Sequence, residues 1–162
     1  MTITAPQQIP ATSDLAAMGN RVVVGMDDDA VSITALRFAA TEAAYRGADV
    51  LAVHVWHYPN TWGYPVLWTD ETNPGTYILE QLQKTVDTVQ AERAEAKQST
   101  VSIRAEVVQG AYSEQLIAVA DGAALLVLGA RHHNRLLGSV SQACMNHPPC
   151  ALVVVPPLHQ PR

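Results

Sequence analysis

Three consecutive aspartates, Asp27 to Asp29, form the densest group of carboxylates in the chain. They follow a short β-branched run, residues 21–26, and directly precede an alanine-rich segment, residues 30–46. One of them is well placed to cap the N-terminus of a helix, because its side chain can accept hydrogen bonds from first-turn N–H groups. Alternatively, the three carboxylates could together bind Mg²⁺, which prefers oxygen ligands. The cap is the interpretation that we favour.

A second group of polar side chains lies between Gly129 and Gly138 and consists of Arg131, His132, His133 and Arg135. These side chains could contact a phosphate, since charged donors form strong hydrogen bonds to phosphate oxygens. They could also be solvated polar residues of a surface loop, and both interpretations stay open. A metal site at the two histidines is not expected, because no carboxylate or cysteine has matching local spacing.

Aromatic and titratable residues also gather around the segment at residues 49–56. His54 lies in an apolar run, where a single histidine is more often a core residue than a catalyst. The three tryptophans of the chain follow closely, interleaved with two tyrosines: Trp56, Tyr58, Trp62, Tyr64 and Trp68. This cluster is interpreted either as a hydrophobic cover over the next helix or as a lid or partner surface.

Segments with strand and helix patterns alternate along the chain and would position these groups. Apolar or alternating runs predict strands at residues 21–26, 49–56, 101–108, 124–128 and 151–155. Helical spacing of apolar residues predicts helices at residues 30–46, 77–98, 112–121 and 139–147. Strict alternation is typical of a parallel sheet with right-handed crossovers and helices on both faces.

Ligands of such sheets bind beyond the carboxyl ends of the strands, where the strand order switches. Function is therefore expected at residues 25–29, after the first strand, and at residues 55–58, after the second. The third expected segment is the turn at residues 129–141, which follows the fourth strand.

The composition describes one acidic domain with few charges. The 162 residues suffice for a single domain, 48% of them are hydrophobic, and only 15% are charged. A net charge of −5 argues against a dedicated nucleic-acid-binding protein, which would carry a basic face. Residues 1–19 are interpreted as a flexible polar tail that precedes a single domain at residues 20–158.

The ends and the cysteines favour a cytoplasmic protein that does not bind membranes. The N-terminus has no positive charge before an apolar run, and no apolar stretch has the length of a membrane helix. The two cysteines, Cys144 and Cys150, are too few for a disulfide scaffold or a zinc site and are predicted to be reduced thiols.

Several segments, taken in order, resemble the universal stress protein family. They are Val22-Val-Val-Gly-Met-Asp27, Arg46-Gly-Ala-Asp-Val-Leu-Ala-Val-His-Val-Trp56, Leu125-Leu-Val-Leu-Gly-Ala-Arg131, Leu137-Gly-Ser-Val-Ser141 and His147-Pro-Pro-Cys-Ala-Leu-Val-Val-Val-Pro156. The resemblance implies a three-layer α/β/α sandwich with a five-stranded parallel, Rossmann-like sheet of the adenine nucleotide alpha hydrolase type, in strand order 3-2-1-4-5. It also implies a homodimer formed through the last strand, residues 151–155. Some members of the family bind ATP or AMP, and others lack nucleotide.

The nucleotide-binding members share a glycine pattern after the fourth strand, Gly-x2-Gly-x9-Gly-Ser/Thr. Gly129 matches its first glycine, and Gly138 and Ser139 match its last pair, whereas His132 replaces the middle glycine. Eight residues separate Gly129 from Gly138, fewer than in the pattern, so a triphosphate would be wrapped less completely. The resemblance also implies that Asp27 contacts the adenosine and that Val55 packs on adenine. The full implied nucleotide site is Gly25, Asp27, Val55, Leu128, Gly129, Arg131, His132, Gly138, Ser139, Val140 and Ser141.

Two functions follow as hypotheses. In the first, the protein is a regulatory stress-response module that binds ATP or AMP, with Mg²⁺ if the ligand is ATP. In the second, favoured by the departures in the glycine pattern, it is a nucleotide-free dimer that acts on a regulatory partner. An enzyme is least supported, since the sequence shows no Walker lysine and no convincing catalytic base.

Overall fold

The computed structural model describes residues 20–57, 73–130 and 138–157, which form alternating strands and helices as predicted. The tail predicted at residues 1–19 lies outside the described residues. The elements are β1 (Arg21–Met26), α2 (Ala30–Arg46), β2 (Asp49–Trp56), α3 (Pro74–Glu95), β3 (Ile103–Gln109), α4 (Tyr112–Ala120), β4 (Leu125–Gly129), α5 (Ser139–Asn146) and β5 (Leu152–Val155).

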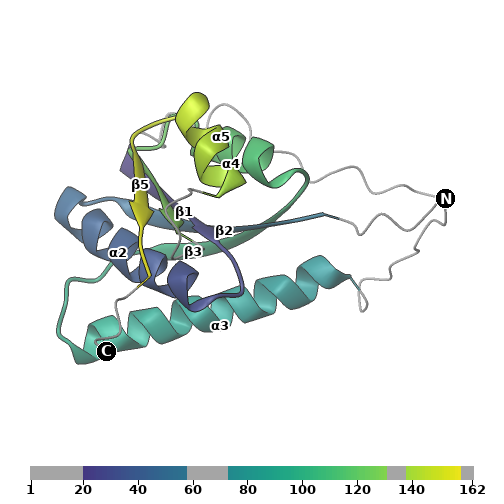
Figure 1. The fold of residues 1–162 in the computed structure, drawn as a ribbon. Helices are drawn as coiled ribbons and strands as arrows, with labels where there is room; N and C mark the ends of the chain where they lie inside the picture. Colours follow the sequence, from purple (N-terminus) through teal and green to yellow (C-terminus); the bar gives the residue numbers. More distant parts are fainter. Residues whose placement is uncertain (1–19, 58–72, 131–137, 158–162) are drawn as a thin grey trace, which may run out of the picture.

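The five strands form one parallel sheet in the order β3-β2-β1-β4-β5, which confirms the predicted topology. Figure 1 shows α2 and α3 on one face of the sheet and α4 and α5 on the other. Successive strands are therefore added on one side of β1 up to β3 and on the other side from β4 onward, so the strand order switches between β1 and β4. The carboxyl ends of these two neighbouring strands define the edge at which a ligand site is expected.

Each face of the sheet has its own hydrophobic core. On the α2 and α3 face, the predicted helical stripe is confirmed, because Leu36, Ala39, Ala40 and Ala43 of α2 are all fully buried. Small alanine side chains let the helix lie close to the strands. The opposite core contains Val23, Leu51, Val53, Val55, Leu116, Leu126, Leu128 and Cys144, among others. Because side chains alternate along a strand, neighbouring valines of β1 serve opposite cores.

Helix α3 both begins and ends earlier than the predicted residues 77–98. It starts at Pro74, three residues before the predicted start at residue 77. Proline is favoured in the first turn of a helix, and the Asn73 side chain caps α3 by accepting a hydrogen bond from the Gly75 N–H at 2.9 Å. The inward position after Val89 belongs to Arg93, whose guanidinium donates to the Ser99 carbonyl at 3.0 Å. The apolar stripe therefore ends before Ala96, which is exposed.

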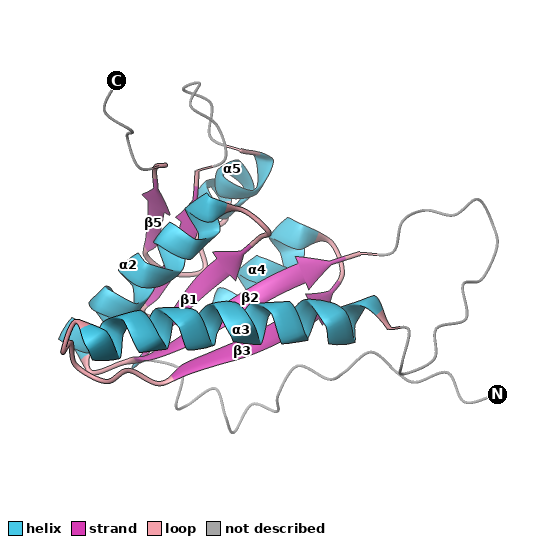
Figure 2. Cartoon of the chain, turned by 90° about the horizontal axis from the view of Figure 1, so that it is seen from below, coloured by secondary structure: helices cyan, strands magenta, loops and turns pink. Residues whose placement is uncertain are grey.

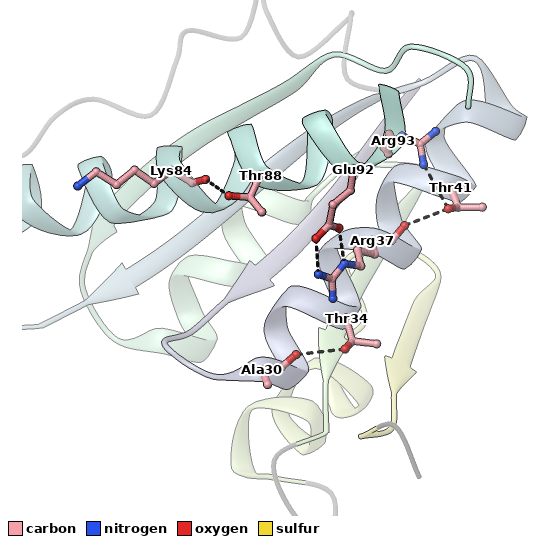
Figure 3. Close-up of polar contacts among 8 residues, drawn as sticks. All are labelled: Ala30, Thr34, Arg37, Thr41, Lys84, Thr88, Glu92 and Arg93. Atoms are coloured by element: carbon pink, nitrogen blue, oxygen red, sulfur yellow. Dashed lines mark hydrogen bonds and ion pairs between the residues drawn. The ribbon is translucent and has the colours of Figure 1, made fainter. Parts of the chain in front are cut away.

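Polar contacts join α2 and α3 along their solvent side. The Arg37 guanidinium donates two hydrogen bonds of 2.8 Å to Glu92, and Arg93 reaches Thr41 (Figure 3). The side-chain hydrogen bond raises the pKa of Arg37 and lowers that of Glu92. Both side chains are more than 40% exposed, so solvent screens this pair and packing holds the two helices together. Figure 2 shows α3 lying across the same face of the sheet as α2.

Candidate functional site

The turn from β1 into α2 is fixed by Asp29, which confirms the predicted helix cap. Its Oδ1 accepts hydrogen bonds from the backbone N–H of Ser32 at 2.7 Å and from the Ser32 hydroxyl at 2.8 Å. The same Ser32 oxygen accepts a bond from the Asp27 N–H at 3.0 Å. Ser32 is buried, so this small network holds the backbone of Asp27 at the end of β1.

The three aspartates are not grouped so that they could hold Mg²⁺ by themselves. Asp29 is committed to the cap, and the Asp27 carboxylate accepts a bond from the Asp28 N–H at 3.0 Å. Within residues 20–57, 73–130 and 138–157, no three His, Cys, Asp or Glu side chains are grouped so that they could hold a metal ion. Any Mg²⁺ at this edge would have to arrive with a ligand that supplies oxygen atoms of its own.

Two glycines of the implied site are required by packing. A Cβ on Gly25 would lie 2.7 Å from Cδ2 of Leu128, and one on Gly129 would lie 2.9 Å from Cγ1 of Val31 and 3.2 Å from its carbonyl oxygen. The 2.7 Å and 2.9 Å distances are shorter than real Cβ contacts, and the 3.2 Å distance is tighter than most of them. Gly25 thus leaves space for the Leu128 side chain of β4, and Gly129 lets the end of β4 lie close to Val31 in the first turn of α2.

Gly138 differs from these two glycines because nothing in the described structure needs it to be glycine. Its φ is −59°, and no described heavy atom lies within 4 Å of an added Cβ. It stands at the N-cap of α5, and no described side chain caps this helix. The N–H groups of Ser139, Val140 and Ser141 therefore have no acceptor inside the helix, and they carry the positive end of its dipole.

Val55 and Asp27 stand at the same level of the sheet edge. Met26 is paired with His54, so the next residues along these parallel strands, Asp27 and Val55, are adjacent in register. Val55 is buried in the core on the α4 and α5 face, and Val140 of α5 packs against that core. The structure therefore gathers the described residues of the implied site at one edge: Gly25, Asp27, Val55, Leu128, Gly129, Gly138, Ser139, Val140 and Ser141. Arg131 and His132 lie outside the described residues.

A cavity of about 320 Å³ lies on the opposite face, beside the aspartate turn. Its walls come from α2, α3 and the ends of β1 and β2: Met26, Asp27, Asp28, Asp29, Ala30, Ile33, His54, Ile78, Gln81, Leu82 and Thr85. His54 was expected to be a core residue, but it is half-buried and lines this cavity. Burial lowers the pKa of His54, and the nearby Asp28 carboxylate opposes that shift.

The aromatic cluster and the cysteines are described in part. Trp56 lies close to the first turn of α3, since a Cβ on Gly75 would be 3.3 Å from its Nε1. This agrees with a cover over the following helix, whereas Tyr58, Trp62, Tyr64 and Trp68 lie outside the described residues. Cys144 is buried, Cys150 is half-buried, and both are free thiols whose pKa values are raised by burial.

The sequence of the whole folded region matches one family. A profile of the universal stress protein family covers residues 18–156. The chain belongs to the universal stress protein family. A universal stress protein of Mycobacterium tuberculosis is 28% identical over 143 residues, which are 83% of this chain and 46% of that protein. The chain thus spans about half the length of the curated relatives it matches.

Solved universal stress proteins share the fold described above. One of them, in complex with cAMP, is 26% identical with a TM-score of 0.59, over 83% of this chain and 94% of that protein. Another, from Archaeoglobus fulgidus in complex with dAMP, is 21% identical with a TM-score of 0.62, over 83% and 96% of the two chains. At its lower identity, the second likeness shows the fold alone. Across the described residues, no helix is both long and apolar enough to cross a membrane.

Proposed function

We propose that this universal stress protein is a regulatory module that binds an adenine nucleotide at the carboxyl edge of its sheet. The observation that carries the proposal is the N-terminus of α5, which no described side chain caps, at the same edge as Asp27 and Val55. Free N–H groups at a helix N-terminus bind phosphate through hydrogen bonds and the helix dipole. The family membership and the relative solved with cAMP support adenine as the base.

Each residue would have a separate part in binding. The carboxylate of Asp27 would accept bonds from the ribose hydroxyls, and Val55 would pack on the base. The phosphate would lie against the N–H groups of Ser139 to Ser141, where Gly138 leaves room for it. Arg131 and His132 would donate hydrogen bonds to the phosphate oxygens. No residue in this arrangement is assigned a catalytic role, so we propose binding and not turnover.

We propose AMP or another mononucleotide over ATP as the preferred ligand. Only eight residues separate Gly129 from Gly138 in the sequence, and one helix N-terminus supplies enough free N–H groups for a single phosphate. The carboxylates of the β1–α2 turn would repel the additional charge of a triphosphate. ATP would therefore bind mainly as its Mg²⁺ complex, in which the cation offsets part of that charge.

Calorimetric titration of the purified protein tests the proposal. AMP, cAMP, ATP and ATP with Mg²⁺ are titrated in turn, and the supernatant of heat-denatured protein is analysed for bound nucleotide. AMP is expected to bind more tightly than ATP without Mg²⁺. An absence of binding heat at millimolar concentrations of every nucleotide, together with a supernatant free of adenine nucleotide, would refute it.

Gly138→Ala locates the phosphate. Because no described atom lies within 4 Å of the added Cβ, the variant should fold normally. Its methyl group would stand where the phosphate approaches the backbone, so AMP affinity should fall by about tenfold, or about 1.4 kcal/mol. Ala91→Val, which adds bulk at an exposed position of α3, is the matched control and should bind like the wild type. Unchanged affinity in Gly138→Ala would mean that the phosphate lies elsewhere.

A further inference from the structure

Tyr112, the first residue of α4, reaches from its own helix to the end of β1. Its hydroxyl donates a hydrogen bond to the carbonyl oxygen of Met26 at 3.1 Å, and the two residues are 86 positions apart in the sequence. Met26 directly precedes Asp27, so the bond ends at the edge of the proposed nucleotide site. Gly110, with a φ of +150°, turns the chain from β3 into this helix.

The aromatic ring of Tyr112 lies on the face of the sheet where the base is proposed to bind. It packs against the core that contains Val55, Leu116 and Leu128, and Val140 of α5 packs against the same core. Burial, followed by the charges of Asp29 and Cys144, raises the pKa of Tyr112 to about 12. The hydroxyl therefore stays protonated at neutral pH and remains a donor to Met26.

We propose that the side chain of Tyr112 occupies the base-binding part of the nucleotide site and must move aside before a nucleotide binds. The inference rests on the proposed function and adds to it the residue that controls entry. The ring packs against the same core as Val55, the residue on which the base is proposed to pack. Its hydroxyl uses the Met26 carbonyl, an acceptor that the exocyclic amine of adenine could use in its place.

This arrangement predicts which change to Tyr112 helps binding. A nucleotide that enters the wild-type protein must break the bond to Met26 and lift the ring off the core, and its apparent affinity is lowered by that cost. Tyr112→Ala removes both contacts and should bind AMP at least about tenfold more tightly. Tyr112→Phe keeps the ring and removes the hydrogen bond, so it should bind only about threefold more tightly.

Nitration of the wild-type protein tests the movement without any variant. Tetranitromethane modifies accessible tyrosines, and peptide mass spectrometry reports each tyrosine separately. Tyr45 and Tyr77 are 83% and 65% exposed and serve as internal references that should react equally with and without AMP. Tyr112 should react slowly alone and at least about fivefold faster with saturating AMP, because binding displaces it into solvent.

Calorimetry on the same proteins separates the two proposals. Tyr45→Ala, an exposed position of α2, is the control and should bind AMP like the wild type. Tighter binding by both Tyr112 variants, or binding by the variants alone, supports the inference. If AMP binds but Tyr112→Ala binds equally or more weakly and nitration is unchanged, the inference is overturned and the proposed function stands. If no protein binds AMP, both are overturned. Should Tyr112→Ala not fold, Tyr112→Phe and nitration decide.

Discussion

At the scale of single residues, the candidate site depends on which polar groups already have partners. The Asp29 carboxylate accepts two hydrogen bonds from Ser32 in the first turn of α2, so its role is structural. Asp27 is held in place by the same network but sits at the open edge of the sheet. Asp27, whose carboxylate also accepts a hydrogen bond from the Asp28 N–H, is the aspartate proposed to contact the nucleoside.

The role of Asp29 can be measured as stability. Asp29→Ala removes the acceptor for both bonds from Ser32, and we expect the free energy of unfolding to fall by about 1–2 kcal/mol. Asp28→Ala is the matched control, because Asp28 is exposed and its neighbour Asp29 makes the cap. Urea denaturation followed by circular dichroism gives both values. Equal losses in the two variants would contradict the assigned cap.

His54 should make stability depend on pH. Its folded pKa lies below the ordinary value of 6.5, so the unfolded chain binds the proton more readily. Stability contributed by neutral His54 is therefore present above 6.5 and is lost as the pH falls from there toward the folded pKa. His54→Gln cannot titrate, so the stability advantage of the wild type should shrink between about pH 7.5 and about pH 5. Thermal melts of both proteins across this pH range measure the difference in stability. A difference that stays constant with pH would contradict the lowered pKa of His54.

At the scale of elements, the strands and helices follow from local patterns, whereas contacts between them do not. The alanine stripe of α2 and the valine runs of β1 and β2 repeat at short spacing, so both were predictable. The contact of Tyr112 was not predictable from the sequence, because its hydrogen-bond partner Met26 is 86 residues away and α4 itself shows no signal for it. The cavity beside His54 was missed for the same reason, since α3 and the aspartate turn meet only in the folded chain.

The glycines illustrate this difference between pattern and packing. A shared motif suggested one role for Gly129 and Gly138, but only Gly129 is enclosed by another element. Gly129→Ala should push β4 away from Val31 and lower the free energy of unfolding by about 1–3 kcal/mol. Gly138→Ala should leave it nearly unchanged. Urea denaturation of the two variants checks this, and similar stability losses would show that the glycines have one structural role.

At the scale of the whole molecule, β5 leaves one side of the sheet open. β5 stands at the end of the strand order, and all four of its residues are only partly buried, whereas the central strands are enclosed on both faces. An apolar edge strand readily pairs with another strand, because its outward N–H and carbonyl groups are unpaired. We therefore propose that two copies of the chain pair through β5, as the resemblance to the family implies.

Light scattering should then give a mass about twice 17.4 kDa at micromolar concentration. Among the described residues, Leu152 belongs to the core on the α4 and α5 face and Val153 and Val155 to the core on the α2 and α3 face, whereas Val154 belongs to neither. Val154→Lys should therefore halve the mass with little loss of stability, because the charge would be buried only between two copies. Leu79→Lys, at a position of α3 that is 40% exposed, is the control and should keep the larger mass. A wild-type mass near that of one chain would contradict the dimer, and a doubled mass in Val154→Lys would place its interface away from β5.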